Sequence, residues 1–424
     1  MLIYAEQNSP RLRYIAEFAG RQTIGESFRV TQDGDEYKGS VFPKINYSDR
    51  PLQEGEIWIV PQGLLFEKNI REKGIECSEL NGVKIFFQNN SSFGFDILAA
   101  CFYLISRYEE YLPHQEDEYG RYSHLNSLAY KNRFLDQPLV NKWMAVLRNK
   151  LGMKDPNKFE FLPTYDIDEA WSYKYKHWFR NIGGMVRDQL KGDKARAKLR
   201  KNVRAWKEKD PYDSFDWMDA LHDTYNLKPL YFFLVAGSNG KYDKNTLPSN
   251  DAMKGLIKRV TSKYEIGVHP SWQTGEHPEL LKKEIAFLEN ISAKNITTSR
   301  QHFLRFKLPD GYRRLINAGI NEDHSMGYGT INGFRASVAS SFFWFDLGKN
   351  EATNLLVHPF CFMDANSFYE MKQTPAQALE ELRYYLNEVR SVNGNLITLW
   401  HNTFLGTEER FSGWREVYED FLKE

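Results

Sequence analysis

Residues 159–168 read FEFLPTYDID, a mostly apolar run that ends in two aspartates. Its length and composition predict a β-strand that ends near residue 167. Asp166 and Asp168 are two positions apart, so their side chains point to the same side of the strand. Two carboxylates in one small volume suit a site in which one group holds a cation and the other accepts a proton. A simple turn or helix-cap role for the pair is the alternative.

Further strands and helices alternate along the rest of the chain, as their hydrophobic patterns indicate. The strands are predicted at 228–235, 265–269, 296–303, 354–357 and 396–400, and the helices at 214–225, 251–264, 278–290, 310–318 and 374–391. Alternating strands and helices imply parallel strands. Functional side chains in such folds gather at the carboxyl ends of the strands.

The first 155 residues predict a smaller α/β domain, followed by a linker, MKDPN, at 153–157. Its strands are predicted at 2–5, 28–31, 56–61 and 83–87, and its helices at 96–111 and 137–151. The charged stretch RYEE at 107–110 and the segment 117–121 read as a solvated helix end and a loop. We therefore expect two domains, 1–155 and 156–424, the second carrying the chemistry.

The composition excludes several classes of protein. With 42% hydrophobic and 15% aromatic residues, the chain can build a large core and is not disordered. Lys plus Arg and Asp plus Glu both number 56, which argues against a chain built to bind nucleic acid. Cys77, Cys101 and Cys361 have no paired spacing, so neither a disulfide framework nor a cysteine zinc site is expected. No signal peptide or bilayer-spanning run is visible, so we expect a cytoplasmic protein.

Histidines follow other predicted strands in the same way that the aspartates follow the first. His269 ends the strand 265–269, and His401 follows the strand 396–400. Arg300 and His302 lie two apart on the strand 296–303, so alternation would place them on one side of it. Polar groups at four strand ends of a parallel sheet are expected to share one site.

The residues that carry these groups resemble the polysaccharide deacetylases with a NodB-homology domain, carbohydrate esterase family 4. The resemblance rests on TYDID at 164–168, EIGVH at 265–269, SRQHF at 299–303, EDHSMGY at 322–328 and LITLWHN at 396–402. The whole chain further resembles a bacterial group with an additional N-terminal α/β domain, through the stretches 93–113, 210–216 and 333–337. The resemblance implies an α/β fold, a distorted (β/α) barrel of the NodB type, preceded by a smaller α/β domain.

The resemblance also implies an activity and roles for five residues. It implies a metal-dependent hydrolase that removes N-acetyl groups from an amino sugar in a glycan or glycan precursor, with one divalent metal ion, commonly zinc. By position, Asp166 matches the general base and Arg300 the residue that orients it. Asp168 matches the metal-binding carboxylate and His269 the first histidine ligand. His401 matches the histidine that acts as general acid.

One departure concerns the third metal ligand. The usual second motif of the family is His-x-x-x-His, but Gln273 stands four positions after His269. Three residues could complete the site: His302, His277 after a loop insertion, or Gln273 as a weak ligand. We expect His302, because strand alternation would aim it with Arg300. Without a third ligand, the domain would be a non-catalytic carbohydrate-binding module on the same fold.

Other residues near the motifs have open roles. Asp323 could orient His401 or Arg300, or it could serve a turn. The aromatic residues that flank the motifs, Tyr165, Trp272 and Trp400, could stack on a sugar ring, and core packing is the simpler role for Tyr165. A glycosidase with two carboxylates is another class to consider, but it leaves His269, Arg300 and His401 without functions.

A basic insertion separates the first two strands of the second domain. Residues 172–209 contain 13 Lys or Arg and three acidic residues. Apolar residues are interspersed: Trp178, Phe179, Ile182, Met185, Val186, Leu199, Val203 and Trp206. A basic amphipathic helix is typical of binding to an anionic membrane surface, and a solvated helical excursion is the plainer interpretation.

The membrane interpretation makes a direct prediction. Reversing several of the Lys and Arg charges in 172–209 should weaken binding to liposomes that contain anionic lipid by at least about tenfold, because each basic residue near the surface contributes about 1 kcal/mol. The measurement is co-flotation of wild type and variant with anionic and with neutral liposomes. Equal flotation of the two proteins would contradict a membrane contact through this segment.

Overall fold

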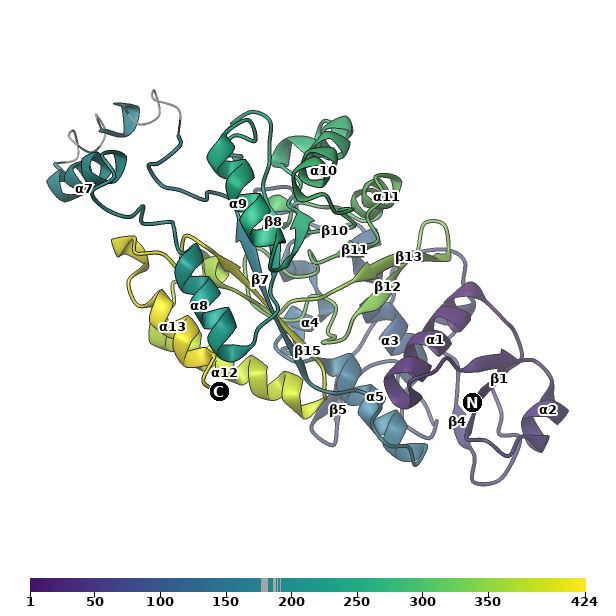
Figure 1. Ribbon diagram of the computed structural model, residues 1–424. Helices are drawn as coiled ribbons and strands as arrows, with labels where there is room; N and C mark the ends of the chain where they lie inside the picture. The colour runs from purple at the N-terminus through teal and green to yellow at the C-terminus, as the bar shows by residue number, and fades with distance from the viewer. Residues whose placement is uncertain (177–181, 186–187, 189, 191) are drawn as a thin grey trace.

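The computed structural model describes residues 1–176, 182–185, 188, 190 and 192–424. Its larger part is a curled, nine-stranded sheet with helices packed against it, and its N-terminal part is a smaller α/β unit at one edge of that sheet (Figure 1). This arrangement confirms the expected fold class, a distorted (β/α) barrel preceded by a smaller α/β domain.

The N-terminal unit is built on a parallel sheet with the strand order β2-β1-β3-β4. Its strands are β1 (Leu2–Ala5), β2 (Arg29–Thr31), β3 (Lys44–Tyr47) and β4 (Ile57–Ile59), with a hairpin of β5 (Ser78–Leu80) and β6 (Val83–Ile85). Its helices are α1 (Pro10–Ile24), α2 (Gly34–Gly39), α3 (Ile97–Ile105), α4 (Leu128–Lys131) and α5 (Leu139–Lys150). Helix α1, which was not predicted, has a well-marked start and end: Ser9 caps it, Pro10 opens it, and Gly25 follows it with a left-handed φ of 79°.

The large sheet has the strand order β12-β13-β11-β10-β9-β8-β7-β15-β14. Its strands are β7 (Glu160–Ile167), β8 (Leu230–Phe233), β9 (Glu265–Val268), β10 (Thr298–Ser299), β11 (Glu322–Asp323), β12 (Phe342–Asp346), β13 (Glu351–Val357), β14 (Phe362–Met363) and β15 (Asn395–His401). All neighbours pair in parallel except β12, which runs antiparallel to β13. Strands β11, β12 and β14 were not predicted, and two of them are only two residues long, too short to show a hydrophobic period.

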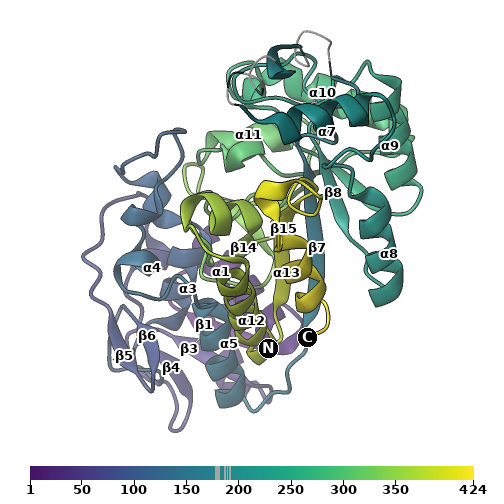
Figure 2. The ribbon, with the colours of Figure 1, turned by 90° about the vertical axis from the view of Figure 1, so that its left-hand side faces the viewer.

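Five helices of the larger part correspond to predicted ones: α8 (Phe215–Tyr225), α9 (Asp251–Thr261), α10 (Pro278–Ser292), α11 (Asp310–Asn317) and α12 (Pro375–Ser391). Helix α7 (Lys194–Arg204) lies in the basic insertion, and α13 (Trp414–Phe421) was not predicted. Figure 2 shows α12 and α13 beside β15, with α10 and α11 above them in this view. Helix α12 begins with a capping box in which Thr374 and Gln377 satisfy each other's backbone amides.

The core combines apolar residues from the strands and the covering helices. All four residues of β8 are buried, as expected for a strand covered on both sides. Cys101 and Cys361 are buried thiols, and Cys77 is partly buried. Within the described part of the chain, no helix is both long enough and apolar enough to cross a membrane.

The strand predicted at 296–303 is wrong beyond Ser299. The chain leaves the sheet after β10 and makes a tight 3₁₀ turn at His302–Leu304, in which Phe303 has a left-handed φ of 58°. His302 therefore does not reach its place by strand alternation with Arg300. The turn sets the direction of its side chain instead.

The basic insertion extends from the barrel as α7, seen at the upper left of Figure 1. Arg200 of this helix pairs with Asp188 at 2.9 Å, and Arg196 lies 3.7 Å from Glu408, so two of its cations are held by the protein. Leu190 is 84% exposed. Three of the apolar positions noted in the sequence, Trp178, Phe179 and Val186, lie outside the described residues.

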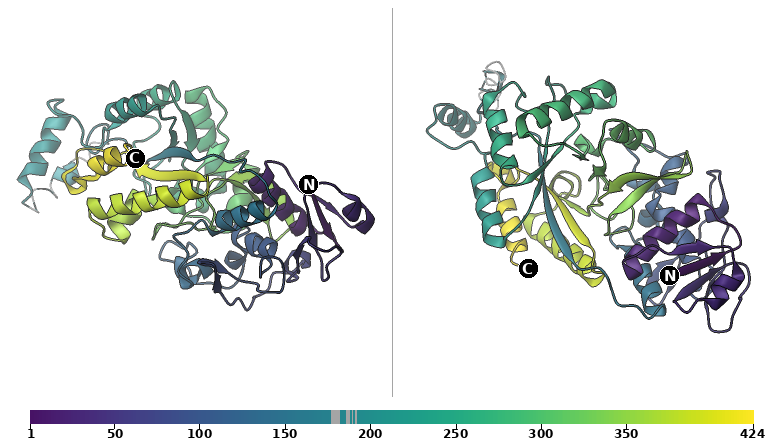
Figure 3. Two further views of the ribbon diagram at one scale, coloured as in Figure 1. Left: turned by 90° about the horizontal axis from the view of Figure 1, so that it is seen from below. Right: turned by 45° about the vertical axis from the view of Figure 1, so that its right-hand side comes forward.

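The N-terminal part lies against the barrel in both views of Figure 3, and a buried ion network joins the two. Glu110 accepts two hydrogen bonds from Arg335, at 2.8 and 2.6 Å, and one from Arg107 at 2.7 Å. Arg107 also bonds Glu109 at 2.9 Å. All four side chains are buried, so the expected solvated helix end at 107–110 is wrong. These charged side chains are buried because Arg335 of the barrel pairs with Glu110.

This network makes the stability of the fold depend on pH. Burial would raise the pKa of Glu110, but Arg335 and Arg107 outweigh it and lower this pKa to about 2. Because the pKa of a free glutamate is about 4.3, the ionised carboxylate stabilises the fold above that pH, and its contribution falls as the pH approaches 2.

Replacing Glu110 by Gln should therefore destabilise the protein by about 3 kcal/mol at pH 7, because buried Arg335 loses its carboxylate partner and Arg107 keeps only Glu109. Urea unfolding followed by tryptophan fluorescence measures the free energy of unfolding. The difference in this free energy between variant and wild type should become smaller below about pH 4. Asp420→Asn, which removes an exposed partner of Lys423, is the control and should cost under about 0.5 kcal/mol. Equal effects of the two variants would contradict the role of the network.

Candidate metal centre and catalytic site

The register of the parallel strands aligns the residues that follow them. Val268 of β9 pairs with Ser299 of β10, so the next residues, His269 and Arg300, lie at the same height. At the other side of the site, β15 pairs with β7 so that His401 lies directly beside Asp166. Paired residues in parallel strands project to the same side, which brings these side chains into one volume.

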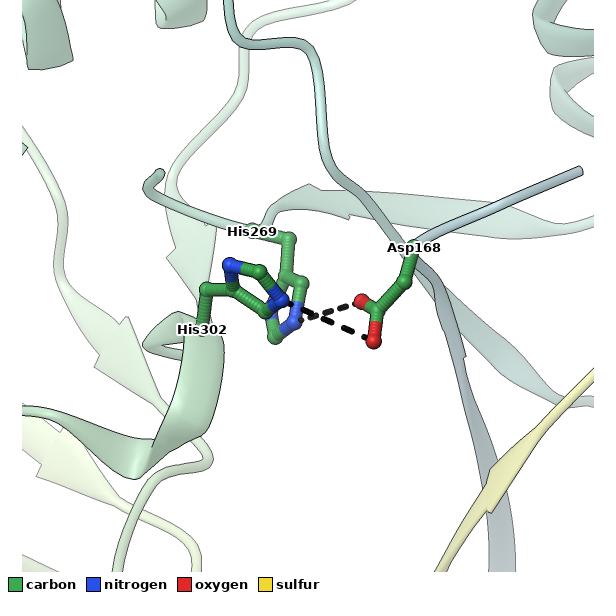
Figure 4. Close-up of side chains that lie close together, drawn as sticks. All are labelled: Asp168, His269 and His302. Carbon is green, nitrogen blue, oxygen red and sulfur yellow. Dashed lines mark ion pairs between the residues drawn. The ribbon is translucent and has the colours of Figure 1, made fainter. Parts of the chain in front are cut away.

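Asp168, His269 and His302 form a close group (Figure 4). Nε2 of His269 lies 3.2 Å from Oδ1 of Asp168, and Nε2 of His302 lies 3.6 Å from Oδ2 of the same carboxylate. One ligand atom from each residue lies within 4.8 Å of the other two. Two imidazoles and one carboxylate are a ligand set suited to zinc, with a fourth position left for a water molecule or substrate.

A hydrogen-bond partner at Nδ1 orients each of the two imidazoles toward the centre of this group. Nδ1 of His269 faces the carbonyl oxygen of Arg300 at 2.5 Å, and Nδ1 of His302 faces Oδ1 of Asp243 at 3.0 Å. Each ring therefore presents Nε2 to the site, as is usual for histidine ligands of a metal. Oδ1 of Asp168 is buried and makes no hydrogen bond. These donors fit a divalent ion.

The charges of the group favour a cation. Burial would raise the pKa of the Asp168 carboxyl, but the imidazoles of His302 and His269 outweigh it and hold this pKa well below its usual range. Burial would lower the pKa of His302, yet Asp168 and Asp243 raise it to about 9. The site therefore holds positive charge strongly, and a metal ion would take the place of the imidazole protons.

Asp166 lies beside this group and is held by Arg300. Nη1 of Arg300 donates to Oδ1 of Asp166 at 2.9 Å, while its Nε donates to the carbonyl oxygen of His324 at 3.0 Å. The guanidinium lies 4.5 Å from the centre of the Phe232 ring and is fully buried. Oδ2 of Asp166 is left 3.6 Å from Nε2 of His269, so this oxygen faces the candidate metal position.

His401 has a partner that the sequence analysis missed. Nδ1 of His401 lies 2.6 Å from Oδ1 of Asp364, whose Oδ2 also accepts the His401 backbone N–H at 2.6 Å. Burial would lower the pKa of His401, but Asp364 raises it to about 10. Asp364 follows β14, so the run FCFM at 360–363 ending in an acid was the signal that would have pointed to it.

The other candidate residues, His277, Gln273 and Asp323, lie outside the group of Asp168, His269 and His302. His277 is exposed at the start of α10, where its Nδ1 is 3.6 Å from Glu279. The side-chain amide of Gln273 donates to Asp243 at 3.0 Å and so supports the partner of His302. Asp323 accepts hydrogen bonds from Ser299 and Ser325 on the side of the sheet away from His401.

A cleft of about 420 Å³ opens onto Asp166, Asp168 and His401. Its lining includes aromatic side chains, Tyr119, Tyr212, Phe303, Tyr369 and Phe404, which suit a sugar ring. Tyr119 and Arg121 come from the N-terminal part of the chain, so that part helps to shape the cleft. Arg121 is held there by the carbonyl oxygen of Phe303 at 2.6 Å.

The three flanking aromatic residues take different places. Tyr165 and Trp400 are fully buried in the core. Trp272 is partly exposed and stacks on Tyr242, with ring centres 3.8 Å apart, while the guanidinium of Arg305 lies 3.9 Å from its ring. Of the three, Trp272 is the one that presents a partly open surface near the cleft.

A protein-family model matches the N-terminal part of the chain. Residues 1–156 match a family model, DUF7033, that is described as a family of unknown function. No curated protein matches the chain.

Several solved structures are similar at low identity. A putative polysaccharide deacetylase from Mycobacterium smegmatis is 15% identical, with a TM-score of 0.40 over 63% of this chain and 85% of that one. A polysaccharide deacetylase from Bacillus cereus is 12% identical, with a TM-score of 0.32 over 63% of this chain and 87% of that one. A mutant of a CE4 family pseudoenzyme is 10% identical, with a TM-score of 0.30 over 63% and 64%. These similarities are too distant to assign an activity to this chain.

The hydrogen bond from Asp243 to His302 predicts a specific effect on metal affinity. Asp243→Asn should weaken zinc binding by about 10–100-fold, because the amide no longer supports the basicity and orientation of the imidazole. Competition with a chromogenic chelator measures the affinity. Glu279→Gln, next to the exposed His277, is the matched control and should bind zinc like wild type. Unchanged affinity in Asp243→Asn would argue against His302 as a ligand.

Proposed function

We propose that this protein is a metal-dependent hydrolase that removes an N-acetyl group from an amino sugar in a glycan or glycan precursor. One observation carries the proposal. A carboxylate held by an arginine, Asp166, and an imidazole held by a carboxylate, His401, flank the group of Asp168, His269 and His302. This is the arrangement that amide hydrolysis needs, a base and an acid on either side of a Lewis acid.

The chemistry follows from the difficulty of the reaction. Water is a poor nucleophile, and the amine leaves only with a proton. When bound by Asp168, His269 and His302, a zinc ion would polarise the acetyl carbonyl and lower the pKa of the attacking water to about 7.

The chain's own residues handle the protons. Asp166 accepts the proton of the attacking water at Oδ2, since Oδ1 is engaged by Arg300. Arg300 keeps this carboxylate in place and neutralises its charge when no proton is bound. His401, with a pKa raised to about 10, carries a proton at neutral pH and can give it from Nε2 to the departing nitrogen. The aromatic lining of the cleft would hold the sugar ring while these steps occur.

A non-catalytic carbohydrate-binding module is the alternative, and one sequence feature supports it. Gln273 occupies the position of the second histidine of the family motif. The distance of 3.6 Å between Nε2 of His302 and Oδ2 of Asp168 supports His302 as the third ligand, and with it the enzyme. The two functions differ in whether zinc-loaded protein releases acetate.

The decisive measurement is acetate release from a panel of N-acetylated sugars by zinc-loaded protein. Asp166→Asn should lower kcat by about 10²–10⁴, because the base is lost, while zinc binding persists. His277→Gln, which alters an exposed histidine outside the site, should keep full activity. Zinc-loaded wild type that binds sugars without releasing acetate would favour the binding module, and cleavage of glycosidic bonds in the same panel that survives chelation would favour a glycosidase.

A further inference from the structure

His269 and Arg300 belong to a row of residues that directly follow neighbouring parallel strands. This row continues beyond Arg300, after strands β11 and β13. Asp323 of β11 pairs with Ser299 of β10 and with Val357 of β13. The next residues, His324 and His358, therefore lie side by side at the height of Arg300. Backbone hydrogen bonds extend the sheet to them: the His324 N–H donates to Ser299 at 2.8 Å, and the His358 N–H donates to Asp323 at 2.8 Å.

A third polar side chain shares this face of the sheet. Glu322 of β11 lies two positions before His324, which follows the strand, so both project to the same side. Nε2 of His358 lies 3.2 Å from Oε2 of Glu322, and the rings of His324 and His358 stack with centres 4.3 Å apart. One ligand atom from each of the three residues lies within 4.8 Å of the other two. Among the described residues, this and the group around Asp168 are the two sets with this property.

The hydrogen bonds around the two imidazoles leave ligand atoms free. Nδ1 of His358 is bound to the Ser341 hydroxyl at 2.8 Å, which turns Nε2 toward Glu322. His324 is 2% exposed, and its Nδ1 has no hydrogen-bond partner. A buried imidazole nitrogen without a partner costs stability unless another group satisfies it, and the proposed function assigns no role to these three residues.

We propose that Glu322, His324 and His358 form a second divalent metal site, separate from the one at Asp168. Two imidazoles and one carboxylate are a ligand set that zinc takes in proteins, with a fourth position for water. The Glu322 side chain is 43% exposed, which leaves an ion a route from solvent. Binding turns the two rings out of their parallel stack, because the lone pair of each nitrogen lies in the plane of its ring.

The position of the second site links it to Arg300. The carbonyl oxygen of His324 accepts the hydrogen bond from Nε of Arg300 at 3.0 Å, and Arg300 in turn holds Asp166. An ion that joins the ends of β11 and β13 would fix the backbone that supports Arg300. The second site thus acts on the candidate base by positioning, without contact with the reacting atoms.

The test counts zinc ions per chain, by equilibrium dialysis of the full-length protein against Zn²⁺ and elemental analysis. We expect two ions in wild type and one in each of three variants, His358→Gln, Glu322→Gln and His302→Gln. The double variant with His302→Gln and His358→Gln should bind none. His277→Gln removes an exposed histidine that also lies near a carboxylate, and as the matched control it should still bind two.

The outcomes separate this site from the first one. Two bound ions in His358→Gln, or a single ion in wild type that His302→Gln abolishes, would overturn the second site and leave the proposed function intact. Loss of one ion in His358→Gln but none in His302→Gln would support the second site and contradict the first. Circular dichroism checks folding, and if His358→Gln does not fold, Glu322→Gln decides, with at least about tenfold weaker binding of one ion expected.

Discussion

The parallel pairing of neighbouring strands is the constraint on which the candidate site depends. Seven residue pairs join β15 to β7, and the last of them sets His401 beside Asp166. The pairing of β9 with β10 sets His269 beside Arg300 in the same way. A shift of one residue in either pairing would turn every side chain beyond it to the other face of the sheet. The candidate site thus depends on the backbone hydrogen bonds of the strands that lead into it.

The hydrogen-bond partners of the candidate histidines determine which ring nitrogen of each histidine faces the site. Asp243 and the carbonyl oxygen of Arg300 each occupy one nitrogen of an imidazole and leave the other for an ion. Asp364 does the same for His401 but serves a different end, because it keeps that ring charged. In the proposed function, similar hydrogen bonds therefore serve two roles, metal binding and proton donation, according to whether the free nitrogen faces a cation or a leaving group.

The N-terminal part is integrated with the barrel. Tyr119 and Arg121 line the cleft, and the network of Glu110 with Arg335 lies buried between the two parts. A buried charge network is favourable only when every member has a partner, so this contact specifies one mutual arrangement. The same arrangement brings Tyr119 to the cleft. The shape of the cleft and the stability of the contact are therefore linked.

The sequence by itself determined the alternation of strands and helices, and with it the edge of the sheet where Asp166, Asp168, His269 and His401 gather. Hydrophobic period and strand ends are local properties, so they can be read along the chain. It did not reveal Asp364 or Asp243, because β14 is two residues long and Asp243 lies outside the regular elements.

Only the tertiary structure decided which residues stand behind the ligands and which charges are buried. His302 lies near Asp168 through a turn after β10, although alternation along a longer strand was the reason for expecting it. Arg107 and Glu110 are buried because Arg335, 225 positions from Glu110, faces them. Contacts between residues so far apart depend on how the elements pack in three dimensions, and no local pattern encodes them.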